Sequence, residues 1–162
     1  MFHCFAMKPL MLFTDASADP ESGIGFGAFL LTDRIDPGAL KDAVQIQRFE
    51  NTSSTRLELE TVIGALREIQ PDKITIYSDS QNLIDLPNRR ARLERANFCS
   101  KQNKPLNNAD LYREFFQLMD RIDCTFVKVK GHRRTKEKNE IEQIFTLVDR
   151  ASRQALRAEL MR

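Results

Sequence analysis

The sequence predicts one α/β domain over residues 1–162, built on a five-stranded mixed sheet with helices on both faces. Three apolar segments with short connections open the chain, which favours an antiparallel arrangement of the first three strands. Amphipathic helical patterns then alternate with two β-branched segments, an order typical of a sheet covered by helices. With 162 residues, of which 41% are hydrophobic and 30% charged, the chain has the size and composition of a single globular domain.

Each strand is predicted from an apolar or β-branched segment that ends at turn residues. Strands are expected, in order, at Leu10–Asp15, Ile24–Thr32, Val44–Glu50, Lys73–Asp79 and Cys124–Lys130. A turn at 19–23 separates the first two strands, and the Asp-Pro-Gly sequence at 36–38 marks a longer loop before the third.

Helices are predicted where apolar residues recur at spacings of three and four. The clearest covers Thr55–Ile69, and Thr55 with Glu58 forms a capping box at its start. A short helix is expected from Gln81, and Asn108 is expected to cap a helix that runs to Met119. The last helix carries an apolar stripe over four turns.

The near-neutral formal charge of +2 conceals strongly basic segments. Residues 89–104 and residues 128–138 each contain six basic side chains against one acidic side chain, a local charge of +5 in both segments. The last helix adds arginines at 150, 153, 157 and 162. One such segment is often only a solvated face, but the combination favours a polyanionic partner.

Other features indicate a reduced, membrane-free location. The longest apolar stretch, Ile24–Leu31, is too short to span a bilayer, and the start of the chain lacks the features of a signal peptide. Cys4, Cys99 and Cys124 are odd in number and widely spaced, as is typical of free thiols. We expect a cytoplasmic protein with no obligatory protein partner.

Acidic residues follow two apolar strands. Asp15 and Asp79 each end a strand, so adjacent strands would place both carboxylates at one edge of the sheet, where Mg²⁺ could bind them. Structural alternatives exist: Asp15 could form an Asx-turn with Ser17, and Asp79-Ser80 could cap the helix that follows. Glu58 lies at the edge of its helix's apolar stripe and could reach the same site.

The last helix offers two candidates for a fourth carboxylate. Asp149 lies at the flank of the apolar stripe, where it could also form an i,i+4 pair with Arg153. Glu142 lies on the same flank two turns earlier. Four converging acids could hold two divalent ions about 3.5–4 Å apart, an arrangement suited to phosphodiester hydrolysis.

At these residues the sequence closely resembles the ribonuclease H family, in particular the bacterial type 1 enzymes. The matching segments occur in family order and cover nearly the whole chain. They are FTDAS at 13–17, IGFGAFLL at 24–31, TRLELETVIGAL at 55–66, IYSDSQNLI at 76–84, KPLNNADLYREF at 104–115, VKVKGHR at 127–133, NE at 139–140 and VDRAS at 148–152.

The resemblance implies a ribonuclease H-like fold and specific roles for individual residues. The catalytic and metal-binding carboxylates would be Asp15, Glu58, Asp79 and Asp149, with two Mg²⁺ or Mn²⁺ ions, and His132 would assist proton transfer or product release. Ser54 and Thr55 would contact the minor groove of an RNA/DNA hybrid, and Gln81 would also contact substrate. The basic segment would grip the DNA strand through Arg89, Arg90, Arg92, Arg95, Lys101 and Lys104.

The sequence departs from the family pattern at several positions. Ala16 follows Asp15 where glycine is usual, and Asp19 stands in a shortened turn where a neutral Asn is common. His132 and Asp149 are 17 positions apart (149 − 132), whereas about ten separate them in familiar enzymes. The chain has no Trp, although the bacterial enzymes usually carry several in the basic segment.

The resemblance implies an endonuclease that hydrolyses the RNA strand of RNA/DNA hybrids by a two-metal mechanism. Recognition would depend on the backbone and the 2′-OH groups, with little sequence specificity. Two alternatives remain: a DNA-processing nuclease of the same fold, related to resolvases or integrases, and a non-catalytic nucleic-acid-binding module. Clustered carboxylates without a metal would repel phosphate, which disfavours the binding module.

Overall fold

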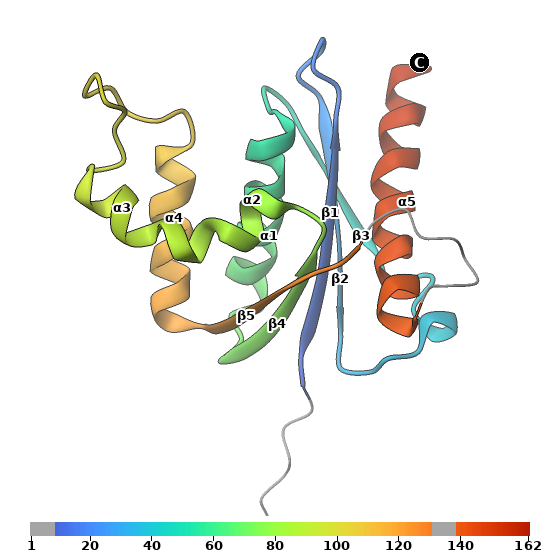
Figure 1. The fold of residues 1–162 in the computed structure, drawn as a ribbon. Coiled ribbons are helices and arrows are strands. Elements are labelled where there is room, and N and C mark those ends of the chain that lie inside the picture. Colours follow the sequence, from blue (N-terminus) through green and yellow to red (C-terminus); the bar gives the residue numbers. More distant parts are fainter. Residues whose placement is uncertain (1–8, 131–138) are drawn as a thin grey trace, which may run out of the picture.

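The fold centres on a single five-stranded sheet (Figure 1). The structure is a computed structural model that describes residues 9–130 and 139–162. Its strands are β1 (Met11–Ala18), β2 (Gly25–Thr32), β3 (Gln45–Phe49), β4 (Lys73–Ser78) and β5 (Asp123–Lys128). Their order in the sheet is β3-β2-β1-β4-β5, with β1, β2 and β3 antiparallel and β4 and β5 parallel to β1. The predicted mixed sheet is confirmed.

Helices cover both faces of the sheet, as predicted (Figure 1). One face carries α1 (Ser54–Ile69), α2 (Gln81–Asp85), α3 (Arg90–Arg95) and α4 (Ala109–Arg121), and the other carries α5 (Glu140–Leu160). Short 3₁₀ turns lie at Pro37–Ala39 and Leu86–Arg89. Each face buries its own hydrophobic cluster, centred on residues such as Leu59 and Phe115 on the first and Phe13 and Val148 on the second. No helix within residues 9–130 and 139–162 is long and apolar enough to cross a membrane.

The first strand is longer than predicted, and this changes the setting of Asp15. The strand continues to Ala18 because residues 15–18 pair with residues 25–28 of β2. Asp15 therefore lies within β1. The neighbouring strand β4 ends at Ser78, so the side of β1 that faces β4 is open next to Asp15. The β1–β4 register aligns Phe13 with Tyr77, whose rings stack at 4.7 Å. Two residues further along, the same register brings Asp15 and Asp79 together.

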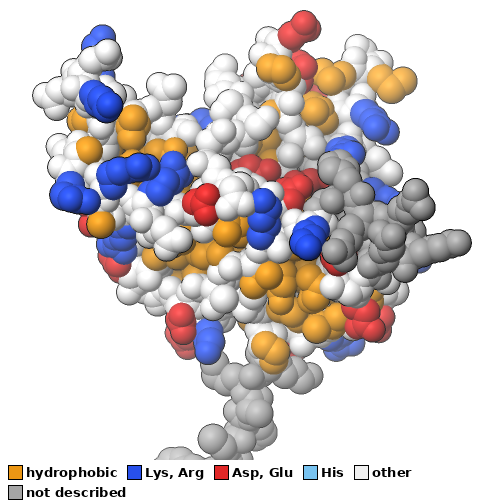
Figure 2. Space-filling view, in the orientation of Figure 1, with side chains coloured by type: hydrophobic (Ala, Val, Ile, Leu, Met, Phe, Trp, Pro, Cys, Tyr) orange, Lys and Arg blue, Asp and Glu red, His pale blue; other side chains and the backbone are white. Residues whose placement is uncertain are grey.

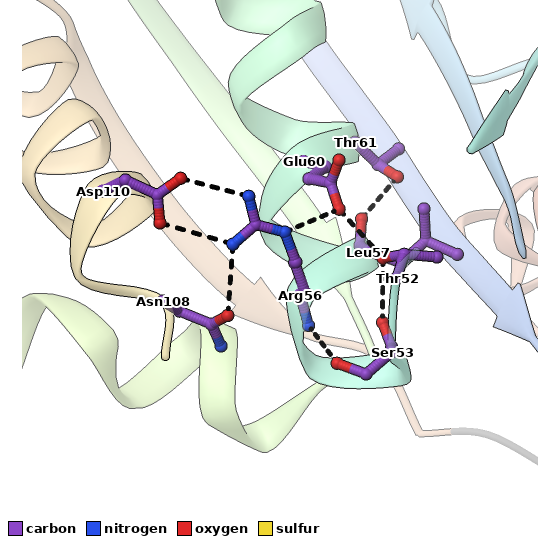
Figure 3. A network of polar contacts seen from close by, with 8 residues as sticks. All are labelled: Thr52, Ser53, Arg56, Leu57, Glu60, Thr61, Asn108 and Asp110. Atoms are coloured by element: carbon purple, nitrogen blue, oxygen red, sulfur yellow. Dashed lines mark hydrogen bonds and ion pairs between the residues drawn. The ribbon is translucent and has the colours of Figure 1, made fainter. Parts of the chain in front are cut away.

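The start of α1 is fixed by a polar network that differs from the predicted capping box (Figure 3). Ser53, and not Thr55, is the N-cap, and its Oγ accepts a hydrogen bond from Arg56 N at 3.3 Å. Glu58 therefore has no capping role, because it lies two residues beyond position 56, where the acid of a capping box that starts at Ser53 would stand. Inside the same network, Thr52 Oγ1 donates to Glu60 Oε1 at 2.9 Å.

Arg56 joins the start of α1 to the start of α4 (Figure 3). Its guanidinium donates to both carboxylate oxygens of Asp110, at 3.3 and 3.1 Å, and to Asn108 Oδ1 at 3.5 Å. Asn108 is the N-cap of α4, as predicted, but its side chain makes no capping hydrogen bond, since it turns toward Arg56. The network therefore fixes the first turn of α1, which carries Glu58, against a second helix.

Two glycines of β2 allow α1 to lie close to the sheet. A Cβ atom built on Gly27 would overlap Thr61 Oγ1, and one on Gly25 would overlap the side chain of Leu57. Thr61 is itself fixed, because its hydroxyl donates to Leu57 O at 2.7 Å. The distance between α1 and the sheet thus depends on the absence of side chains at these two positions.

Candidate active site

Three carboxylates from three different elements converge beside the end of β4. Asp15 comes from β1, Glu58 from the first turns of α1, and Asp79 directly follows β4. Each offers a carboxylate oxygen, and these three oxygens all lie within 4.8 Å of one another. Of the predicted cap at Asp79-Ser80, the serine is the part that the structure bears out: Ser80 is the N-cap of α2, and its Oγ accepts from Leu83 N at 3.3 Å, so the cap does not come from the Asp79 side chain.

Asp149 approaches the same cluster from the opposite layer. It lies on α5 and lines, with the other three carboxylates, a pocket of about 420 Å³. Through a side-chain hydrogen bond and through its charge, Asp149 raises the pKa of Asp15. Its other contact is an ion pair with Arg153, whose Nε lies 2.9 Å from Asp149 Oδ1. Asp149 therefore both forms the predicted i,i+4 ion pair with Arg153 and lines the carboxylate pocket.

Burial and crowding of negative charge alter the acidity of these groups. Burial raises the pKa of Asp15 to about 8, with further contributions from the charge of Asp79 and from the hydrogen bond with Asp149. Burial also raises the pKa of Glu58 well above its usual range, and the charges of Asp15 and Asp79 act in the same direction. A site that disfavours its own ionised state in this way is stabilised by a bound cation.

The donor set fits a divalent metal ion. Glu58 Oε2 is buried and has no hydrogen-bond partner in the part of the chain that the structure describes. Its neighbours are carboxylate oxygens, which are the ligands that Mg²⁺ and Mn²⁺ prefer. A cation placed among them would supply the missing partner for Glu58 and offset the mutual repulsion that raises the pKa values.

Ser17 and Ser152, which the sequence did not identify as site residues, support the cluster. Ser152 is fully buried on α5, and its hydroxyl lies 3.3 Å from Asp15 Oδ2 and 3.1 Å from Asp149 O. The Ser17 hydroxyl lies 3.1 Å from Ser152 Oγ. The available signal was a serine within the apolar stripe of the last helix, a position that usually carries an aliphatic side chain.

Glu142, the rival of Asp149, lies away from the carboxylate pocket. It is seven residues before Asp149, or roughly 10 Å along the helix axis at about 1.5 Å per residue. Its backbone N–H donates to the Oδ1 of the N-cap residue Asn139 at 2.8 Å, and it occupies the third helical position, where Glu is favoured near an N-cap. Its place in the first turn of α5 gives Glu142 a structural role at the start of the helix.

The residues predicted to contact substrate near the carboxylates are at the surface. Ser54 and Thr55 are exposed in the first turn of α1, and Ser54 lines the carboxylate pocket. Gln81 begins α2, donates to Asp85 Oδ1 at 2.8 Å and accepts a hydrogen bond from Lys128. His132 lies outside the described residues, so its predicted role stays a prediction.

The basic segment divides into paired and unpaired side chains. Arg90 is committed to the protein: it donates to both oxygens of Asp120, at 2.6 and 3.0 Å, and to Glu94 at 2.8 Å. Arg89 donates to Asn82 Oδ1 at 2.7 Å. The remaining predicted contacts are exposed at or beyond α3, and they are Arg92, Arg95, Lys101 and Lys104.

Aromatic rings support this part of the surface, where the sequence contains no Trp. The Arg90 guanidinium lies 5.2 Å from the ring centroid of Phe116, and that of Arg113 lies 4.8 Å from the centroid of Phe98. Arg113 was not predicted as a surface cation of this region. These contacts hold the arginines on rigid aromatic faces, and they illustrate how the segment is ordered without Trp.

Comparison with known proteins identifies the family to which the chain belongs. The family model described as RNase H matches residues 7–156. A relative from Moorella thermoacetica, named Ribonuclease H, is 31% identical over 143 residues, which cover 85% of this chain and 90% of the relative. Another Ribonuclease H, from Chlorobium phaeobacteroides, is 30% identical over 144 residues, covering 86% and 94% of the two chains.

Solved structures share the fold at low sequence identity. A foamy viral protease-reverse transcriptase in complex with an RNA/DNA hybrid superposes with a TM-score of 0.64 and 14% identity, over 91% of this chain and 20% of that longer chain. A structure of the same viral protein in complex with dsDNA gives a TM-score of 0.61 and 15% identity, over 90% and 95% of the two chains. Since the matched family model spans nearly the whole sequence, the chain belongs to the RNase H family.

Proposed function

We propose that this protein is an endonuclease that hydrolyses the RNA strand of RNA/DNA hybrids. The observation that carries the proposal is the convergence of four carboxylates, from two strands and two helices, in a chain of the RNase H family. The curated relatives are named Ribonuclease H, and one structural neighbour was solved with an RNA/DNA hybrid. The basic surface beyond α3 supports a nucleic-acid substrate.

The carboxylates would hold two divalent ions, Mg²⁺ or Mn²⁺. Asp15, Glu58, Asp79 and Asp149 are the proposed ligands, and Asp15 interacts electrostatically with each of the other three. When bound, the ions supply activation of a water molecule and stabilisation of the leaving oxygen in the displacement at phosphorus. The chain itself excludes water from one side of Glu58 and orients Asp15 through Ser152.

Exposed side chains would position the hybrid around this centre. Ser54, which lines the pocket, would contact the strand that is cut together with Thr55 and Gln81, and His132 is the proposed group for proton transfer or product release. Arg92, Arg95, Lys101 and Lys104 would bind phosphates of the DNA strand. Arg89 and Arg90 are better explained as supports of this surface, because their guanidinium groups already have protein partners.

Cleavage of matched substrates tests the proposal. Labelled RNA/DNA hybrid, double-stranded DNA and double-stranded RNA are incubated with the protein and Mg²⁺, with Asp15→Asn and Asp79→Asn as variants. We expect cleavage of the hybrid alone, and we expect each variant to abolish it while hybrid binding stays intact or tightens, since a negative charge near phosphate is removed. Cleavage of double-stranded DNA would support the DNA-processing alternative. Binding without cleavage of any substrate would support the non-catalytic one.

A further inference from the structure

The outward face of α5 carries three arginines that the proposed reaction does not use. At about 100° per residue, Arg150, Arg153 and Arg157 fall within about 60° of one another around the helix. All three are exposed. With Thr146, Asp149 and Gln154 they line a hollow of about 310 Å³.

This hollow adjoins the carboxylate pocket. Asp149 and Arg153 line both of them, so the two spaces meet along one turn of α5. Figure 2 shows acidic side chains near the centre of this face, with Lys and Arg side chains on either side of them, over the α3 region and over the C-terminal half of α5. The carboxylates therefore lie between two basic surfaces that face the same way.

The charge of the α5 surface is largely uncompensated. Neither Arg150 nor Arg157 forms an ion pair or side-chain hydrogen bond within residues 9–130 and 139–162. No acidic residue occurs between Arg150 and Ala158, and the next acid, Glu159, lies 2.9 Å from the Arg48 guanidinium. Arg153 uses Nε for Asp149 and keeps its terminal N–H groups as donors. An ordinary solvated helix face would more often pair such arginines with acids one turn away.

We propose that Arg150, Arg153 and Arg157 bind backbone phosphates of the cleaved strand beside the cut, on the side of the carboxylates opposite α3. This inference rests on the proposed function. From Arg150 to Arg157 the stripe extends roughly 10 Å at about 1.5 Å per residue, a length that spans about three phosphates of one strand at about 3.4 Å each along a duplex axis. Guanidinium groups suit this role because they can donate two parallel hydrogen bonds to one phosphate.

The test removes arginine charges from the protein and, separately, phosphate charges from the hybrid, and asks whether the two changes affect the same contact. The double variant Arg150→Gln/Arg157→Gln is compared with Arg34→Gln/Arg121→Gln, which removes the same charge at the opposite end of the sheet. Hybrid cleavage is measured over a range of salt concentrations. The α5 variant should raise KM about tenfold near 0.1 M salt, lower kcat far less, and reduce the slope of log KM against log salt by about 1–2, since each lost phosphate contact contributes about 0.9. The control variant should change none of these quantities.

Neutral methylphosphonate linkages then identify the strand. Placed beside the cut in the RNA-containing strand, they should weaken binding to the unchanged protein but not weaken further the binding to the α5 double variant. An unchanged salt slope in that variant would show that these arginines only face solvent and do not bind phosphate. Coupling to linkages in the DNA strand alone would overturn the assignment to the cleaved strand. If the unchanged protein does not cleave hybrid at all, the proposed function fails, a result separate from either of these.

Discussion

The hydroxyl of Ser152 lies 3.3 Å from Asp15 Oδ2 and so joins α5 directly to the central carboxylate of β1. The same hydroxyl lies 3.1 Å from the backbone oxygen of Asp149 and 3.1 Å from Ser17 Oγ. One buried side chain therefore links two carboxylate-bearing elements from different layers of the fold. The relative position of the proposed metal ligands depends on this link.

Ser152→Ala should weaken metal binding more than it weakens the fold. Loss of one hydrogen bond to a charged group is worth about 1.5–3 kcal/mol, and here part of it would be expressed as a less well-oriented Asp15. We expect the Mg²⁺ concentration for half-maximal cleavage to rise about threefold to tenfold, and calorimetric Mg²⁺ affinity to fall in parallel. Ser17→Ala, which removes only the outer hydroxyl, is the matched control and should have a smaller effect. Unchanged Mg²⁺ affinity in Ser152→Ala would rule out the positioning role.

Without metal, the protein should lose stability as the pH rises from about 4 to about 8. Asp15 has a pKa of about 8 in the folded protein against an ordinary value of 3.8, so within this range the folded state holds a proton that the unfolded state has released. Glu58 acts in the same direction because burial raises its pKa. We expect the Tm in EDTA to fall by on the order of 5 °C between pH 5 and pH 8.

Two conditions check the origin of this pH dependence. Asp15→Asn removes the group and should flatten the profile, and it should raise the Tm at pH 8. Saturating Mg²⁺ should also remove the loss, since the cation favours the ionised carboxylates. A Tm that rises from pH 5 to pH 8 in EDTA would contradict the buried, crowded state of Asp15.

Asp149 and Glu142 should differ sharply in their effect on catalysis. Asp149→Asn removes a carboxylate that lines the pocket and should lower kcat by orders of magnitude under Mg²⁺, with little change in Tm. Glu142→Gln should be close to neutral for cleavage, since this side chain lies near the start of α5. Steady-state cleavage of a defined hybrid measures both. Reversed phenotypes would place the fourth ligand two turns earlier on α5.

The basic surface should show the same division into unpaired and paired arginines. Arg92→Gln/Arg95→Gln removes two exposed cations that form no ion pair or side-chain hydrogen bond within residues 9–130 and 139–162, so KM should rise about tenfold and the salt slope should fall by about 1–2. Arg90→Gln breaks contacts with Asp120 and Glu94 and should instead lower the Tm by about 2–4 °C, with a smaller change in KM. Equal effects of the two variants on KM would show that the pairing of Arg90 does not reduce its contact with substrate.

The positions of the strands and helices along the chain, and two of the proposed site residues, followed from local patterns. Strand and helix positions depend on apolar periodicity, which the sequence displays directly, and the acids that follow apolar strands marked Asp15 and Asp79. The end of β1 was predicted three residues too early, because Ala16–Ala18 has no large apolar or β-branched side chain and remains in the strand through its pairing with β2. Strand ends set by a partner strand are invisible to a local pattern.

Contacts between distant residues account for what the sequence could not predict. Ser53 caps α1 in place of Thr55, Arg90 is neutralised by Asp120, and Ser152 contacts Asp15 across 137 positions of the chain. Each depends on how helices pack, which a single sequence does not display. The acids of the proposed site could therefore be predicted from the sequence. The groups that hold those acids in place could be identified only in the structure.

The bare backbone of Gly27 has a consequence for the carboxylate site, about one turn away along α1. The helix can lie against β2 only because no methyl group stands between Gly27 and Thr61, and Glu58 extends from the same helix one turn before Thr61. Gly27, a residue of the second strand without a side chain, thereby helps to set how far the Glu58 carboxylate extends toward Asp15 and Asp79. Even a methyl group at position 27 would push α1 away from the sheet. The proposed metal ligands would then lose their spacing while the overall fold stayed intact.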